Sequence, residues 1–117
     1  MTKKTVLRVA SLFSGCGGSD LGVQGDFSFL NRHYGRLNTK IVFANDVNEK
    51  AAKTYKKNFD HDIEIRSIRD ITVSEIPPHD LLIGGFPCQP FSIVGLRQGF
   101  EDTRGQLFND ITRILKH

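Results

Sequence analysis

The segment best suited to chemistry is LLIGGFPCQPFS at residues 81–92, where a single cysteine follows an apolar run and two glycines. Pro87 fixes its own φ just before Cys88, and Pro90 restricts the residue that precedes it. A cysteine attacks as its thiolate, and its ordinary pKa of about 8.5 leaves little thiolate at neutral pH, so a catalytic site must position the sulfur. Lone cysteines are usually small core residues, but this stiff and open frame favours a nucleophilic role for Cys88.

A glycine cluster with the sequence FSGCGG, at residues 13–18, follows the first apolar run. Glycines between a strand and a helix allow the backbone to approach a ligand closely. Gly15 and Gly17 are followed by Asp20 where the dinucleotide pattern G-x-G-x-x-G has its third glycine, and the phosphate loop G-x-x-x-x-G-K-[ST] is absent. The cluster therefore indicates a nicotinamide cofactor only weakly, and a tight turn without a ligand is the alternative.

An acidic residue, Asp46, lies just past the second apolar run, IVFA at residues 41–44. In nucleoside-binding α/β folds an acid at this place accepts hydrogen bonds from ribose hydroxyls. Asp46 lies further from the glycines than the usual spacing of about 20 residues, and the unpatterned segment 26–40 resembles extra length. A helix cap is the alternative role for Asp46.

Strand-like and helix-like segments alternate along the chain, which is typical of an α/β fold with a mainly parallel sheet. Strands are expected at residues 6–13, 41–44, 62–66 and 80–83, the third near an edge of the sheet. Ser19 or Asp20 is expected to cap a short helix, and segment 26–40 to be a loop or an irregular helix. A longer helix is expected up to about residue 58, capped by Asn45, Asp46 or Asn48. A last helix is expected from about residue 105, with Leu107, Phe108, Ile111 and Leu115 on one side.

Ligands of open α/β sheets bind beyond the carboxyl ends of the strands, where the strand order reverses. If the first and fourth strands flank that point, the glycine turn and Cys88 face one crevice. The last helix reaches His117 without a stop signal, straight after a strand that should be central. We therefore expect the chain to be the N-terminal part of something longer, with the edge of the fourth strand unpaired.

The composition is that of one soluble domain, with 117 residues, 38% apolar content and a net charge of +3. Neither a membrane span nor a signal peptide is expected. Cys16 and Cys88 alone make neither a disulfide framework nor a zinc site, so a reduced, cytoplasmic protein without a metal is expected. Lys50, Lys53 and Lys57 share one helical face, which is most simply a solvated surface.

Three motifs together resemble the N-terminal catalytic region of cytosine-C5 DNA methyltransferases: LFSGCGG at residues 12–18, GGFPCQPFS at 84–92 and GFEDTRGQLF at 99–108. The resemblance covers most of residues 7–117 and is weakest at 26–40. It implies a Rossmann-like, S-adenosylmethionine-dependent methyltransferase fold, with residues 1–117 as the N-terminal portion of the cofactor-binding and catalytic domain. It further implies methyl transfer to cytosine C5 in double-stranded DNA, in a bacterial restriction–modification system.

The resemblance also implies the roles of individual residues. Cys88 is expected to attack C6 of a cytosine flipped out of the duplex, which makes C5 reactive toward the methyl group. Asp46 is expected to bind the ribose, and Val47, Asp70 and Ile71 to contact the adenine. The expected catalytic residues are Pro87, Cys88, Gln89 and Ser92. The expected cofactor-binding residues are Phe13, Ser14, Gly15, Cys16, Gly17, Gly18, Asp46, Val47, Asp70, Ile71, Gly85, Pro87 and Leu107. The expected DNA contacts, in a mobile loop, are Ser92, Arg97, Gln98 and Arg104.

Several parts of the family pattern have no counterpart in the sequence. The Glu-Asn-Val motif, which assists at cytosine N3, the later arginine motif, the target recognition domain and the C-terminal helix are all missing. We therefore expect that the chain alone does not methylate DNA, and that the C-terminal part of the enzyme, from the same gene or a second chain, is its partner. Alternatives are a tRNA cytosine-C5 methyltransferase, whose usual Pro-Pro-Cys differs from Phe86-Pro87-Cys88, and a non-catalytic cofactor-binding or assembly fragment of a split enzyme.

Overall fold

The computed structural model of the chain describes residues 5–85 and 107–116. Its elements are β1 (Leu7–Leu12), α1 (Gly18–Gln24), β2 (Phe27–Phe29), β3 (Arg32–Tyr34), β4 (Thr39–Asp46), α2 (Glu49–Asn58), β5 (Glu64–Ile65), the 3-10 helices η1 (Ile68–Asp70) and η2 (Val73–Glu75), β6 (Leu81–Gly84) and α3 (Leu107–Leu115). Four strands form a parallel sheet in the order β5-β4-β1-β6. The predicted α/β class and mainly parallel sheet are confirmed.

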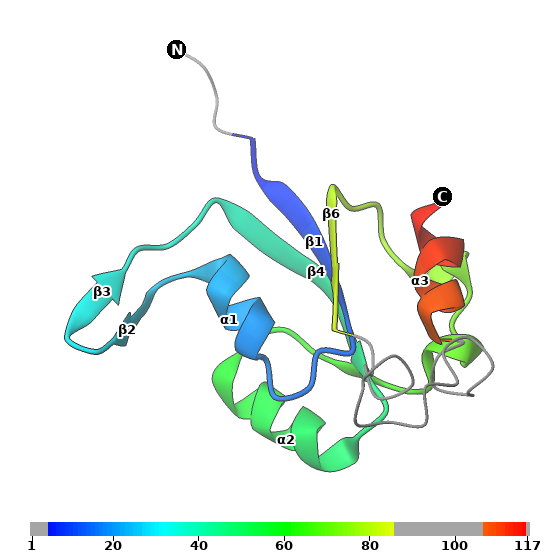
Figure 1. The fold of residues 1–117 in the computed structure, drawn as a ribbon, viewed down its shortest axis with the longest axis horizontal. Coiled ribbons are helices and arrows are strands. Elements are labelled where there is room, and N and C mark those ends of the chain that lie inside the picture. The colour runs from blue at the N-terminus through cyan, green and yellow to red at the C-terminus, as the bar shows by residue number, and fades with distance from the viewer. Residues whose placement is uncertain (1–4, 86–106, 117) are drawn as a thin grey trace, which may run out of the picture.

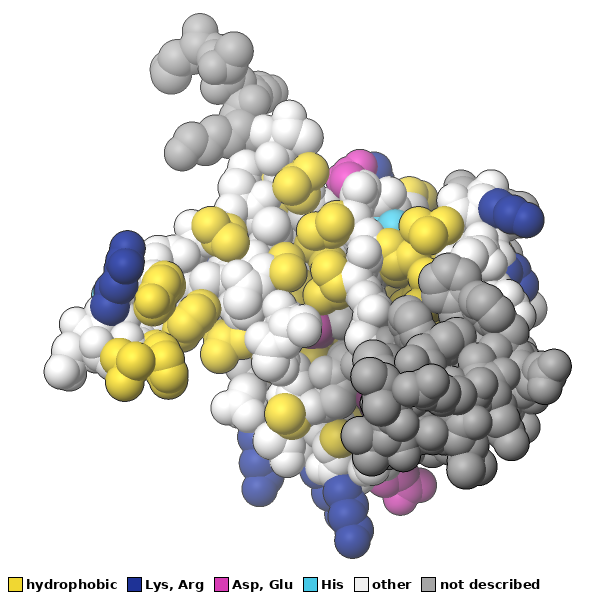
Figure 2. All heavy atoms as spheres, in the orientation of Figure 1, with side chains coloured by type: hydrophobic (Ala, Val, Ile, Leu, Met, Phe, Trp, Pro, Cys, Tyr) yellow, Lys and Arg dark blue, Asp and Glu magenta, His cyan; other side chains and the backbone are white. Residues whose placement is uncertain are grey.

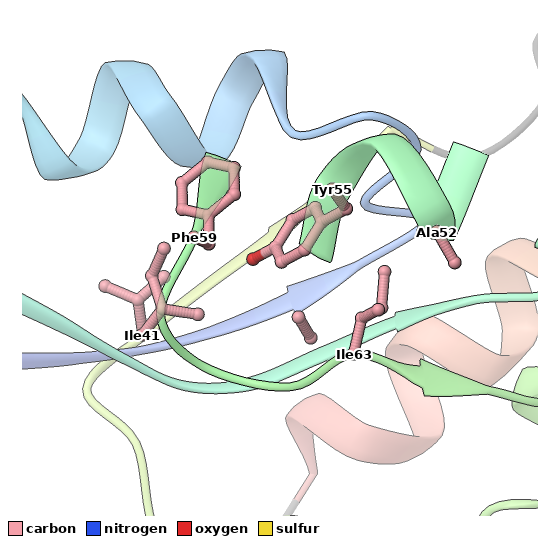
Figure 3. Close-up of a cluster of buried hydrophobic side chains, with 7 residues drawn as sticks. Ile41, Ala52, Tyr55, Phe59 and Ile63 are labelled. Carbon is pink, nitrogen blue, oxygen red and sulfur yellow. The ribbon is translucent and has the colours of Figure 1, made fainter. Parts of the chain in front are cut away.

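Helices cover both faces of this sheet (Figure 1), with α1 and α2 on one side and α3 on the other. Alternate residues of a strand point to opposite faces, and β1 accordingly contributes Val9 to one apolar cluster and Ala10 and Leu12 to another. The cluster beneath α2 contains Val9, Ile41, Ala44, Ala52, Tyr55, Phe59 and Ile63 (Figure 3). The cluster beneath α3 contains Ala10, Leu12, Ile68, Ile71, Ile76 and Ile114. The central strand therefore builds both cores.

The predicted strands and the long helix are found close to their expected positions. The second predicted strand is β4, which is longer than expected. The third predicted strand is β5, which is short but lies at an edge of the sheet as expected. Of the three candidate caps of α2, Asn48 takes the role, and its side chain accepts a hydrogen bond from the Ala51 N–H at 3.0 Å. The lysines of α2 are exposed, as predicted. In the described part of the chain, no helix has the length and apolar character needed to cross a bilayer.

The prediction of a loop or an irregular helix at residues 26–40 was wrong. β2 and β3 form an antiparallel hairpin there, with Phe27 opposite Tyr34 and their rings stacked at 5.0 Å. The two turn residues, Leu30 and Asn31, both have positive φ, as a tight two-residue hairpin turn requires. Leucine carries no such turn signal, and strands of three residues are too short for their alternation to be read.

The predicted start of α1 was also wrong. The N-cap is Gly17, with φ of 100°, whereas Asp20 lies in the first turn and is fully buried. Asp20 was predicted to serve the local backbone, but its carboxylate instead accepts hydrogen bonds from Ser11 and Tyr55.

The side of the last helix that packs on the sheet differs in part from its predicted apolar side. Leu115 is 60% exposed, and its neighbour Ile114 is buried instead. The guanidinium of Arg113 donates to the carbonyl oxygens of Ile68 and Ile71, at 3.2 and 3.1 Å. These contacts tie α3 to η1 and fix the rotation at which Ile114 faces the sheet.

Candidate functional site

The strand register brings three segments of the chain together at the carboxyl edge of the sheet. Leu12 of β1 is paired with Asn45 of β4 on one side and with Gly84 of β6 on the other. The segments that follow these three residues therefore leave the sheet from adjacent strands. After β1 the chain adds β4 and β5 on one side and then crosses to place β6 on the other. The first and fourth predicted strands therefore flank the point of reversal, where α/β folds bind ligands.

The turn after β1 has one packed side and one open side. Phe13, Gly15 and Gly17 all have positive φ, and the Gly17 N–H donates to the Ser14 carbonyl at 3.0 Å. A Cβ added to Gly17 would lie 2.3 Å from Cε2 of Phe59, so only glycine fits there. A Cβ added to Gly15 would meet no atom of the residues that the structure describes within 4 Å. The turn is thus held against α2 on one side and leaves its backbone accessible on the other.

Asp46 is fastened directly to this turn. Its Oδ2 accepts a hydrogen bond from the Gly15 N–H at 2.8 Å, and its Oδ1 accepts one from the Asn48 N–H at the same distance. A carboxylate offers about four lone-pair positions, so further acceptor capacity remains. Val47, the next residue, is 68% exposed. The arrangement places a partly buried acid and an exposed apolar side chain beside the open glycine backbone.

The other predicted cofactor residues lie in different surroundings. Cys16 is an exposed free cysteine in the turn, and Asp70 is exposed at the end of η1. Ile71 is only 1% exposed, with its side chain in the cluster beneath α3, and its predicted contact with the adenine stays a prediction. Gly85 is exposed just after β6, and Leu107 begins α3.

The predicted nucleophile lies outside the described residues. The same is true of every other predicted catalytic residue and of the predicted DNA-contacting loop: Pro87, Cys88, Gln89, Ser92, Arg97, Gln98 and Arg104. Their roles stay predictions. Gly84, four residues before Cys88, is exposed, and an added Cβ would make only ordinary contacts, 3.4 Å from Cδ1 of Ile111 and 3.7 Å from Cβ of Leu12. Because Gly84 pairs with Leu12, the described end of this segment lies beside β1.

A buried polar network behind the glycine turn was not foreseen. Ser11 donates to Oδ1 of Asp20 at 2.6 Å, and the Tyr55 hydroxyl donates to Oδ2 of the same carboxylate. Nε2 of His61 lies 2.6 Å from the Tyr55 oxygen, and the Ser14 hydroxyl lies 2.8 Å from that of Ser11. The buried face of α2 was visible in the sequence, but its partners come from distant positions.

The network also shifts the acidity of its members. Burial, assisted by the hydrogen bond to Asp20, raises the pKa of Tyr55 far above its ordinary value, so its hydroxyl stays protonated. Burial lowers the pKa of His61, although the carboxylates of Asp20, Asp60 and Asp62 oppose that shift. Burial therefore favours the neutral form of the His61 imidazole.

Asn45 is a second buried polar residue that sequence reasoning missed. Its side-chain amide donates to the carbonyl oxygens of Glu64 and Arg66, at 2.8 and 2.9 Å. These bonds hold the two-residue strand β5 against β4. Asn45 was predicted only as a candidate helix cap. Its actual partners, one on β5 and one just after it, lie about 20 residues away and leave no local signal.

The surroundings of the site present basic and apolar side chains. Lysine side chains project from the outer face of α2, and apolar side chains gather on the β2–β3 hairpin (Figure 2). A hollow of about 450 Å³ lies on the α3 face beside the start of β6, lined by residues that include Asp80 and Ile114, and is separate from the glycine turn. Among residues 5–85 and 107–116, no group of three or more metal-ligating side chains comes together.

Comparison with known proteins agrees with this geometry. The family model for C-5 cytosine-specific DNA methylase matches residues 7–117. The chain is 40% identical to the Type II methyltransferase M.NlaX of Neisseria lactamica over 94% of its own length and 32% of the relative's. It is 44% identical to the Type II methyltransferase M.NgoBI of Neisseria gonorrhoeae over 93% of its length and 31% of the relative's.

A solved structure shares both fold and sequence with the chain. The Dnmt2 methyltransferase of S. pombe aligns with a TM-score of 0.66 and 30% identity, over 95% of this chain and 32% of that one. The chain thus spans about a third of the length of the relatives it matches. The resemblance found in the three sequence motifs is confirmed over nearly the whole chain, and the chain belongs to the C-5 cytosine-specific DNA methylase family.

Proposed function

We propose that the chain supplies the S-adenosylmethionine-binding and nucleophile-bearing part of a DNA cytosine-C5 methyltransferase of a bacterial restriction–modification system. The observation that carries the proposal is the bond between the Asp46 carboxylate and the glycine turn, at the point of strand reversal. Family membership and the Type II methyltransferase relatives support the chemistry. The proposed location is the bacterial cytoplasm.

The residues at this edge fit S-adenosylmethionine. The remaining lone pairs of Asp46 suit ribose hydroxyls, and the exposed Val47 suits one face of the adenine. Asp70, exposed at the end of η1, is the proposed polar contact to the adenine. The open backbone around Gly15 and Gly18 suits the amino-acid end of the cofactor. The cofactor supplies a methyl group that is electrophilic because it is bonded to a sulfonium.

The nucleophile activates the acceptor carbon. We assign Cys88 the attack on cytosine C6, which forms a carbon–sulfur bond and shifts an electron pair to C5. C5 would then take the methyl group, whose bond to the sulfonium would break and leave a neutral thioether. A base would remove the C5 proton, and elimination of the Cys88 thiolate would restore the aromatic ring. Pro87, Gln89 and Ser92 are assigned to positioning this thiol, and Arg97, Gln98 and Arg104 to holding the DNA, because of their places in the motif GGFPCQPFS and the segment after it.

The rest of the relatives' length is assigned to functions that the chain's motifs do not provide. We propose that residues 1–117 act with a C-terminal part, which contributes the acid for cytosine N3 and the reading of the target sequence. Double-stranded DNA is the proposed substrate. The isolated chain is expected to show no methyl transfer.

Calorimetric titration with S-adenosylhomocysteine tests the first half of this proposal, with adenosine as the control for nucleoside binding alone. Binding of the former that exceeds binding of the latter supports a cofactor site. If neither S-adenosylhomocysteine nor adenosine gives a heat of binding, the chain does not form the site by itself.

A trapping experiment tests the second half. The chain, completed with its C-terminal part, is incubated with duplex DNA containing 5-fluorocytosine and with the methyl donor. Fluorine cannot leave C5 as a proton does, so the covalent adduct persists. Peptide mapping should place the adduct on Cys88 and not on Cys16. A parallel reaction with tRNA separates the RNA alternative, and no adduct on either nucleic acid would leave only a non-catalytic binding role.

A further inference from the structure

Tyr55 stands where four parts of the chain meet. Its hydroxyl reaches Asp20 of α1 and His61 of the segment after α2, and its ring is stacked on Phe59 at 4.4 Å (Figure 3). A Cβ added to Gly17 would lie 3.0 Å from Cδ2 of the Tyr55 ring. Tyr55 therefore touches the glycine turn through its ring and is fixed from behind through its hydroxyl.

We propose that Asp20, Tyr55 and His61 are positioning residues, which hold the glycine turn in its ligand-binding shape through a hydrogen-bond chain of fixed direction. The inference deepens the proposed function, because it depends on that function for the identity of the ligand. None of the three residues belongs to the predicted cofactor-binding set.

The direction of the chain follows from the chemistry of its members. The Asp20 carboxylate is completely buried and requires donors, which the hydroxyls of Ser11 and Tyr55 supply. Because the Tyr55 hydroxyl donates its only proton to Asp20, the Tyr55 oxygen can act only as an acceptor toward Nε2 of His61. His61 must therefore carry a proton on Nε2.

A second branch of the same network reaches the turn directly. Because the Ser11 hydroxyl donates to Asp20, the Ser14 hydroxyl is the donor toward Ser11, whose hydroxyl oxygen lies at 2.8 Å and whose backbone oxygen lies at 3.1 Å. The Ser14 hydroxyl also accepts from the Asn45 N–H at 3.3 Å. The Ser14 N–H donates to the Asn45 carbonyl at 2.9 Å, and the Ser14 carbonyl accepts from Gly17. A change at Asp20 is thus passed through Ser11 to the first residues of the turn.

The charged groups around His61 do not change this direction. Asp60 and Asp62 flank His61 in sequence, and Asp20 lies on the far side of the Tyr55 hydroxyl. Arg36 and Lys40 line a surface hollow that His61 also borders. Glu64 lines a second hollow that His61 also borders. Protonated or neutral, the imidazole keeps an Nε2–H that points at Tyr55, so the turn should keep its shape across the pH range in which His61 titrates.

The decisive variant is Tyr55→Phe, which keeps the ring against Gly17 and Phe59 and removes only the hydroxyl. Tyr34→Phe is the matched control, because Tyr34 stacks on Phe27 in the hairpin, away from the turn. His61→Gln retains a side-chain N–H donor and tests rescue, and His61→Ala removes it. All variants are made in the full 117-residue chain.

Nuclear magnetic resonance of the unliganded chain gives the first readout. The imidazole ¹⁵N spectrum at neutral pH should show His61 as the Nε2–H tautomer. The amide signals of Ser14, Gly15 and Gly17 should move in Tyr55→Phe and His61→Ala, and stay at wild-type positions in Tyr34→Phe and His61→Gln. Should Tyr55→Phe not fold, the wild-type tautomer still decides, since an Nδ1–H form overturns the proposal.

Affinity for S-adenosylhomocysteine gives the second readout. Loss of a hydrogen bond to a buried carboxylate should weaken binding by about tenfold in Tyr55→Phe, with little change in Tyr34→Phe. If Tyr55→Phe lowers only the melting temperature, and leaves both the turn amides and the affinity unchanged, the proposal is overturned. If the wild-type chain binds no S-adenosylhomocysteine, the proposed cofactor site fails, while the amide signals and the tautomer still judge this inference.

Discussion

Asp46 accepts a hydrogen bond from the backbone N–H of Gly15 at 2.8 Å, although the two residues lie 31 positions apart in the sequence. The two predicted cofactor elements, an acid at the end of β4 and a glycine turn after β1, are therefore held together by a direct hydrogen bond. The same carboxylate also caps the backbone at Asn48, just before α2. A substitution at Asp46 should disturb the glycine turn as well as remove the proposed ribose contact.

Asp46→Asn is expected to weaken S-adenosylhomocysteine binding by about tenfold or more. An amide has one acceptor oxygen, and its NH₂ would face a backbone donor at Gly15 or Asn48. Isothermal titration calorimetry measures the affinity, and the Gly15 amide signal reports the lost bond. Asp26→Asn, at an exposed aspartate just before β2, is the control. Equal affinities for the two variants would contradict the assigned role of Asp46.

Gly17→Ala is expected to destabilise the chain by about 2–4 kcal/mol. The alanine Cβ would overlap the Phe59 ring, and a φ of 100° is unfavourable for any residue with a Cβ. Gly22→Ala is the matched control, because Gly22 lies inside α1 with open space around it, so alanine should stabilise by about 0.5–1 kcal/mol. Urea denaturation followed by circular dichroism measures both. A neutral Gly17→Ala would mean that the turn is not packed against α2.

Ile114→Ala is expected to cost about 2–4 kcal/mol, and Leu115→Ala less than about 1 kcal/mol. Ile114, on the side of α3 that faces the sheet, is 1% exposed, whereas Leu115 is 60% exposed. The two side chains have the same volume and lie on the same turn of the helix, so the pair isolates burial. Denaturation midpoints decide, and the reverse order of the two costs would show that α3 is rotated relative to the sheet.

The Arg8–Asp80 pair should make stability depend on acid pH. The hydrogen bonds from Arg8, from its side chain first and then its backbone N–H, lower the pKa of Asp80 to about 2. The folded pKa lies below the unfolded value of about 3.9, so the stabilisation is complete above about pH 5 and is lost as pH falls toward 2.

Asp80→Asn tests this dependence. The melting temperature of the wild type should exceed that of Asp80→Asn at pH 7, and the difference should shrink as pH falls from about 4 to 2. Asp62→Asn, which changes an exposed aspartate, controls for the loss of a negative charge. A difference that stays constant down to pH 2 would show that Asp80 keeps no special contact with Arg8.

Much of the fold could be predicted from local signals in the sequence. The apolar runs of β1, β4 and β6 and the Asn48 cap of α2 are properties of neighbouring residues. The hairpin could not be predicted, because its register depends on Leu30 adopting a positive φ. The phase of α3 could not be predicted either, since Arg113 sets it through carbonyls of η1 more than 40 residues away.

The candidate site could be predicted in part. Residue types alone pointed to the glycine turn and to Asp46, and the structure brings them together. Their mutual hydrogen bond, and the role of Asp20, could not be foreseen, because helix capping is a short-range rule. The true partners of Asp20, Ser11 and Tyr55, lie 9 and 35 residues away. The contribution of Cys88 stays a prediction from its motif.

The position of β1 at the centre of the sheet has a consequence for how the protein is made. β1 is synthesised before both strands that pair with it, and the Arg8–Asp80 contact beside β6 spans 72 positions. At translation rates of about 5–20 residues per second, β1 waits roughly 4–14 s for that neighbour. Such distant pairings are slow to close, so β6 should join last during refolding as well. Pulse-labelled hydrogen exchange should then show that the amides paired between β1 and β4 are protected before those paired between β1 and β6. The glycine turn and the end of β6 would come together only in that last step.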